Sequence, residues 1–150
     1  MAQQLHDGNS DGAILGYTNK NLVIRTPLVI TTQGAATALN ATGTLTSAMM
    51  LGQIVTSTTA AAVTATLDTG TLLETALLAD MPGGSTTQGI SVSDYFEFSV
   101  VNTGGNAFTV ATATGWTDGG NGFTAVAAGT SARFGVRRTA ANAYTIFKVA

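Results

Sequence analysis

The pattern of apolar and polar residues divides the chain into two parts. Residues 1–20 are rich in Gly, Asn and Asp, a composition typical of turns. An extended apolar stretch follows at 21–32, but Pro27 interrupts it, and proline lacks the backbone donor that a central strand needs. Small residues then lead into a region with regular periodicity. We therefore predict an extended N-terminal arm and linker over residues 1–42 and a folded domain over residues 43–150.

Two short segments of the folded domain carry helix signals. The segment 46–52 begins with a threonine that suits an N-cap and ends with a glycine. The second helix begins with Thr-Leu-Leu-Glu, which fits a capping box formed by Thr71 and Glu74. Apolar residues at helical spacing follow, and Pro-Gly-Gly at 82–84 ends the helix.

From Tyr95 onward apolar residues alternate with polar ones, as in strands with one buried face. Five such strands are separated by glycine-containing turns, the pattern of an antiparallel sandwich or barrel. Two further strands precede them, at 54–56 and 62–67. The predicted fold class is therefore mainly β: an antiparallel, jelly-roll-like β-sandwich with one or two short helices, preceded by the arm. We expect the core to contain the residues on the inward faces of the strands, namely Phe96, Phe98, Val100, Phe108, Val110, Phe134, Val136 and Phe147.

Composition changes this picture because the chain is poor in charge. Charged residues make up 9% of the sequence, against about a quarter in a typical soluble domain. Threonine alone supplies 27 of the 150 residues. The mean hydropathy is +0.29, yet the apolar runs are much shorter than the ~20 residues of a membrane-spanning helix. A compact monomer of this composition would expose apolar surface, so we expect the copies to cover it by forming a homo-oligomer.

Several functional classes lack the residues that they need. The absence of Cys and the single His leave no thiolate ligand and almost no material for a Ser–His–acid triad. Six Lys and Arg residues are too few for the basic footprint of a nucleic-acid binder. His6, Asp7 and Asp11 do not follow a recognised metal-ligand spacing, and the loop 118–122 lacks the acidic residues of an EF-hand. We therefore predict no enzymatic activity, no catalytic or metal-binding residues, no cofactor, and neither nucleic acid nor membrane as a partner.

Three groups of residues are candidates for contact with partners. Arg133 and Arg137 share one face of a predicted strand and, with Arg138, suit an acidic partner surface; the alternative is a solvated face that discourages edge pairing. Trp116 lies in a predicted loop, where it can stack on a glycan or pack across a subunit interface. The arm offers apolar and aromatic side chains that can grip a partner or add a strand to a sheet edge: Leu15, Tyr17, Leu22, Val23, Ile24, Leu28, Val29 and Ile30.

Several segments also resemble those of a known family. They are Asp-Gly-Ala-Ile-Leu-Gly at 11–16, Asp-Tyr-Phe-Glu-Phe-Ser-Val-Val-Asn-Thr at 94–103, Ala-Phe-Thr-Val at 107–110, and Arg-Phe-Gly-Val-Arg at 133–137. In these segments the chain is similar to head decoration and head-fibre proteins of tailed bacteriophages. The resemblance implies a homotrimeric cement protein on the capsid surface of a virion, with the major capsid protein as its partner. A receptor- or glycan-binding adhesion module on the virion is the alternative function.

Overall fold

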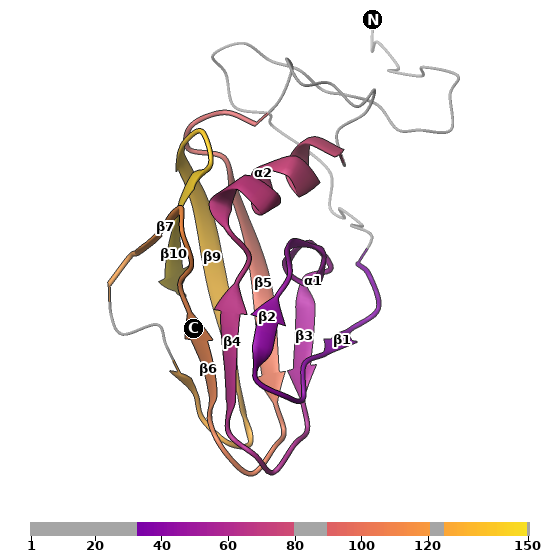
Figure 1. The fold of residues 1–150 in the computed structure, drawn as a ribbon. Coiled ribbons are helices and arrows are strands. Elements are labelled where there is room, and N and C mark those ends of the chain that lie inside the picture. Colours follow the sequence, from indigo (N-terminus) through magenta and orange to yellow (C-terminus); the bar gives the residue numbers. More distant parts are fainter. Residues whose placement is uncertain (1–32, 80–89, 121–124, 150) are drawn as a thin grey trace, which may run out of the picture.

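The computed structural model describes residues 33–79, 90–120 and 125–149, which form two β-sheets and two helices (Figure 1). Sheet A contains, in spatial order, β1 (Thr37–Ala38), β3 (Ile54–Ser57), β5 (Tyr95–Asn102), β9 (Thr130–Ala140), β10 (Ala143–Lys148) and β7 (Trp116–Asp118). Sheet B contains β2 (Gly43–Leu45), β4 (Val63–Leu67), β6 (Phe108–Ala111) and β8 (Ala125–Val126). The helices are α1 (Ser47–Leu51) and α2 (Gly70–Ala79), and α2 lies across one end of the strands (Figure 1). The prediction of a mainly β fold with two short helices is confirmed.

Successive strands from β1 to β9 alternate between the two sheets. A chain that runs along one sheet and returns in the other enters the first sheet again in its original direction. Accordingly β1, β3 and β5 pair in parallel, as do β2, β4 and β6, and β7 is parallel to β10. The antiparallel pairs are β5 with β9, β9 with β10, and β6 with β8.

The predicted antiparallel arrangement is therefore wrong for five of the eight strand pairs of the described residues, because both sheets are mixed. Alternation of apolar and polar residues shows which face of a strand is buried, and it carries no information about the direction of the neighbouring strand. The predicted jelly-roll-like topology assumed that neighbouring strands are antiparallel, and the observed strand directions do not confirm it.

The buried faces of both sheets contribute to one hydrophobic core. Sheet A supplies Val55, Phe98, Val100, Ala132, Phe134, Val136, Tyr144 and Ile146, and sheet B supplies Leu45, Val63, Ala65, Leu67, Phe108, Val110 and Val126. The helices add Met50 and Leu73. Among the described residues, no helix is long and apolar enough to cross a lipid bilayer.

Six of the eight predicted core residues are buried, and Phe96 packs against the core while half-buried. Phe147 is the exception. The register of β10 against β9 places Phe147 opposite Gly135, on the outer face, and directs Ile146 inward. The prediction for Phe147 is wrong because its strand alternates one residue out of phase with the assumed pattern.

Both helices begin at threonine caps. Thr46 Oγ1 accepts a hydrogen bond from the Met49 N–H at 3.3 Å, as the sequence predicted for α1. In α2 the cap is Thr69, whose Oγ1 accepts from the Leu72 N–H at 3.3 Å. The predicted capping box at Thr71 is therefore wrong, and the Glu74 side chain is free to bind residues of sheet A instead.

The last residues of the predicted arm contact the folded domain. β1 pairs with β3, Leu39 packs against the core, and Asn40 Oδ1 accepts from the Thr58 N–H at 2.8 Å. Residues 1–32 lie outside the described residues, so the arm itself stays a prediction.

Candidate functional site

The structure describes four of the residues that the sequence singled out for contact with partners. Trp116 lies in β7, and Arg133, Arg137 and Arg138 lie in β9 of the same sheet. The remaining candidates belong to the arm and lie outside the described residues: Leu15, Tyr17, Leu22, Val23, Ile24, Leu28, Val29 and Ile30.

Arg138 joins sheet A to α2 through an internal ion pair. Its Nη2 and Nε atoms donate to Glu74 Oε1 and Oε2 at 2.6 and 3.0 Å, and both side chains are 12% exposed. Glu74 Oε2 also accepts from the Tyr144 hydroxyl at 2.6 Å and from the Asn142 N–H at 3.2 Å. The Arg138 guanidinium is therefore engaged within the chain, separate from the two arginines that precede it in β9.

This network fixes the protonation of its members. The hydrogen bond from Arg138 outweighs desolvation and lowers the pKa of Glu74 from 4.5 to about 2. Burial, followed by the hydrogen bond to Glu74, raises the pKa of Tyr144 well above its usual value of 10.0. The hydrogen bond with Glu74 raises the pKa of Arg138. At neutral pH the carboxylate, phenol and guanidinium thus all keep the forms that the hydrogen bonds require, and the network acts as a structural clamp.

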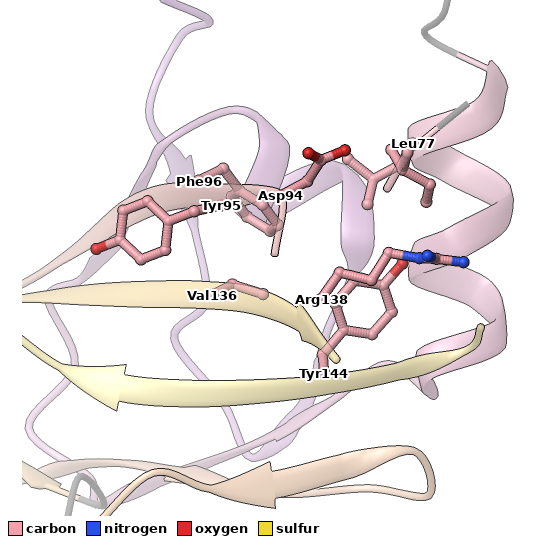
Figure 2. A pocket seen from close by; sticks show the side chains of 8 residues that line it. Leu77, Asp94, Tyr95, Phe96, Val136, Arg138 and Tyr144 are labelled. Atoms are coloured by element: carbon pink, nitrogen blue, oxygen red, sulfur yellow. The ribbon is translucent and has the colours of Figure 1, made fainter. Parts of the chain in front are cut away.

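A cavity of about 170 Å³ lies beside the clamp, between α2 and sheet A (Figure 2). Its lining is mainly apolar and includes Leu77, Ile90, Phe96, Val136 and Tyr144, with Asp94, Tyr95 and Arg138 at its boundary. In Figure 2 the Tyr95 side chain points away from the helix, whereas Arg138 reaches toward it. Tyr95 therefore belongs in part to a different surface.

That surface is the outer face of sheet A. Arg133 and Arg137 are exposed there, while Phe134 and Val136 face the core, as the strand spacing predicted. Arg133 Nε lies 3.4 Å from Glu97 Oε2, with the two side chains 52% and 35% exposed. Arg137 Nη2 donates to Ser93 Oγ at 2.9 Å.

Tyr95 lies across Gly135, between these two arginines. A Cβ atom at position 135 would collide with the tyrosine ring, so the glycine permits this close approach. The Tyr95 hydroxyl donates to Glu97 Oε1 at 2.6 Å, and this hydrogen bond raises the pKa of Tyr95. The side chain nevertheless remains 52% exposed. The contact of Tyr95 with Gly135 was not predicted from the sequence, although a glycine in mid-strand between Arg133 and Arg137 indicates that another group lies close to the backbone.

Two hollows adjoin Arg133 on the same face. The larger, of about 300 Å³, is lined by Ile54, Ser99, Val101, Ser131, Ala132 and Arg133. The smaller, of about 220 Å³, is lined by Gln33, Gln53, Ile54, Glu97, Phe98, Ser99 and Arg133. Because Ile54, Ser99 and Arg133 line both, the hollows are neighbours. We call the surface formed by Tyr95, Glu97, Ser99, Arg133 and Arg137 the arginine face.

The outer face of sheet B differs sharply from the arginine face. Its strands contain no charged residue, and their register places Thr44 beside Thr66 and Thr64 beside Thr109. Threonine suits a strand face that is wetted without being charged. We call this surface the threonine face, formed by Thr44, Thr64, Thr66, Thr109, Ala111 and Ala125.

Trp116 is half-buried and packs against the core. Its Nε1 donates to the Asp68 carbonyl at 2.6 Å, and its ring centroid lies 5.5 Å from that of Tyr144. The residue occupies a short strand, so the prediction that it lies in a loop is wrong. Its contact with a subunit or a glycan stays a prediction.

The other acidic residues considered in the sequence form turns. Asp94 Oδ2 accepts from the Ser91 N–H at 2.6 Å, and Asp118 Oδ1 accepts from the Gly120 N–H at 2.8 Å. Over residues 33–79, 90–120 and 125–149 there is no group of three His, Asp or Glu side chains placed to hold a metal ion. His6, Asp7 and Asp11 lie outside these ranges.

The arrangement therefore offers binding surfaces on two sheets, the arginine face and the threonine face. Comparison of the chain with protein-family models, curated proteins and solved structures gave no match.

Proposed function

We propose that this protein is a virion structural protein that decorates the outside of a phage capsid as a homotrimer and bridges major capsid subunits. The observation that carries the proposal is the pair of contrasting outer faces. One is lined by threonines on strands that contain no charged residue, and the other combines arginines with an exposed tyrosine. A decoration protein needs two kinds of contact, one with its sister copies and one with the shell. We further propose that the two sheets stack as a β-sandwich, an arrangement supported by their common core.

Symmetry explains how weak contacts can suffice for this function. An icosahedral shell repeats its threefold and quasi-threefold sites, so a trimer can engage three neighbouring subunits together. Linking three weak contacts can raise the overall affinity by about 10²–10⁴-fold over that of one contact. Because the trimer would bind the assembled shell and not its separated subunits, it would stabilise the shell by mass action.

The test combines light scattering with imaging of capsids. The purified protein is expected to be a trimer in solution and to add density at threefold or quasi-threefold positions when mixed with undecorated, expanded phage heads. A variant lacking residues 1–30 is expected to remain a trimer and to stop binding the heads, because we propose that the arm contributes to the contact with the shell. The proposal is overturned if the purified protein is monomeric and does not bind the heads. Binding to sugars on a glycan array, with no binding to heads, supports the adhesion module in its place.

A further inference from the structure

We infer that the arginine face is a contact surface between copies of this chain, and that it receives the β7 edge of the neighbouring copy, where Asp118 lies. The inference rests on the proposed function, since it assigns the contact within the proposed trimer. It adds which surface the copies share, which charges meet, and that the contact joins two different patches.

The side chains of the arginine face are those that protein contacts favour. Tyr and Arg are enriched in interfaces and in the few positions that dominate their binding energy. Tyr95 and Arg133 are each 52% exposed, and the neighbouring hollows offer Ile54 and Val101 as an apolar lining. Tyr95 is already held in place by Gly135 beneath it and by its hydrogen bond to Glu97. Little conformational entropy is therefore lost when a partner covers the ring.

The distribution of charge selects a second copy, docked through a different surface. The arginine face carries two arginines and one glutamate, a net charge of +1, whereas the described residues together carry −1, which leaves −2 for the described residues outside the face. Two arginine faces that met each other would bring +1 against +1. The same face is attracted to the remaining surface of another copy. A contact between two different patches forms a closed trimer when it rotates each copy by one third of a turn, and an open filament when the rotation does not close.

The β7 edge of sheet A provides the complementary patch. β7 pairs with β10 on one side only, and it ends in the exposed Asp118. Among the other carboxylates of the described residues, Glu74 and Glu97 form ion pairs, Asp68 accepts from Ser47, and Asp94 accepts from the Ser91 N–H and lines the cavity beside α2. Asp118 accepts from the Gly120 N–H of its own exposed turn, and its carboxylate has no cationic partner among the described residues. Arg137 is the matching cation, because its side-chain partner within the described residues is the neutral hydroxyl of Ser93.

A charge exchange tests the inference on the full-length protein. Arg137→Asp and Asp118→Arg are each expected to weaken the trimer, so that it dissociates at protein concentrations at least about tenfold higher than those at which the wild type dissociates. Sedimentation and light scattering measure this concentration. The double variant is expected to recover most of this loss, because the charges then meet again with their signs reversed. Thr66→Asp places the same kind of charge on the threonine face and is the matched control, expected to leave the trimer intact.

Circular dichroism establishes that each variant is folded, and Tyr95→Ala supplies a second disruption of the face if a charge reversal prevents folding. A wild-type monomer overturns the proposed function together with the inference. A wild-type trimer that both single reversals leave unchanged overturns the inference alone. Failure of the double variant to recover the trimer overturns the pairing of Arg137 with Asp118.

Discussion

The ion pair between Glu74 and Arg138 makes the free energy of unfolding depend on one carboxylate. Glu74→Gln keeps the shape of the side chain and leaves Arg138, which is 12% exposed, without its counter-charge. Removing one partner of a buried ion pair costs about 3–5 kcal/mol. The amide oxygen of Gln can still accept one hydrogen bond from Arg138, so we expect a loss near the lower end, about 3 kcal/mol. For a domain of this size the melting temperature then falls by roughly 6–12 °C.

The dependence of stability on pH gives a second, independent measure of the free energy that the Glu74 carboxylate contributes to folding. The pKa of Glu74 is about 2 in the folded protein, against 4.5 for an unperturbed glutamate. Because the folded pKa is the lower one, the carboxylate contributes stability that is present above about pH 4.5 and is lost as the pH falls toward 2. The difference between these two pKa values corresponds to no more than about 3–4 kcal/mol, and solvent that reaches the 12% of each side chain still exposed reduces it. The wild type is therefore expected to lose stability more steeply than Glu74→Gln on acidification below pH 4.5.

Urea unfolding at fixed protein concentration measures both effects, with the fluorescence of the single tryptophan, Trp116, as the probe. Glu97→Gln is the matched control, because it breaks an ion pair whose side chains are 52% and 35% exposed. We expect that control to cost less than about 1 kcal/mol. The reasoning is refuted if Glu74→Gln costs no more than the control at pH 7, or if its stability falls as steeply as that of the wild type between pH 5 and 3.

Three further predictions concern single contacts. Gly135→Ala is expected to displace the Tyr95 ring at a cost below about 1 kcal/mol, whereas Gly104→Ala, whose Cβ would meet the Thr59 carbonyl, is expected to cost more; equal melting temperatures for the two variants would contradict this. Asn102→Ala is expected to lower the free energy of unfolding in urea by about 2–4 kcal/mol. Asn102 is 1% exposed, and its Nδ2 donates to the carbonyls of Asn106, Val126 and Ala127. A loss below about 1 kcal/mol would refute this expectation. Trp116→Phe removes the hydrogen bond to the Asp68 carbonyl, and we expect it to lower the free energy of unfolding by about 1 kcal/mol, measured by calorimetry. A variant that does not fold would contradict this prediction.

The local elements of this fold could be predicted because their signals lie within a few residues of one another. The cap at Thr46 and the glycine at 52 define α1, and the alternation around Phe98 identifies the buried face of β5. The same spacing rule placed Arg133 and Arg137 on one exposed face. These inferences need no knowledge of the neighbouring strand.

The parts that could not be predicted depend on residues far apart in the chain. Glu74 and Arg138 are separated by 64 positions, and only the topology brings them together. Their pairing also explains the failed capping box, since the same carboxylate satisfies a stronger set of partners. The contact of Tyr95 with Gly135 likewise requires the register between β5 and β9. Strand direction belongs to this class, which is why the parallel pairs were missed.

The alternation of strands between the two sheets has a consequence for how the chain folds. Each strand from β1 to β4 pairs with the strand that comes two strands later in the chain, so strands that are neighbours in sequence form no hairpin between β1 and β6. Among the described strands, β9 and β10 are the pair joined by a tight turn. Long loops must therefore close before most ladder hydrogen bonds form, which favours slow, highly cooperative folding. A nascent chain that ends after α2 still lacks β5 and β6, which pair with β3 and β4. Neither sheet can therefore be completed until the second half of the protein has been synthesised.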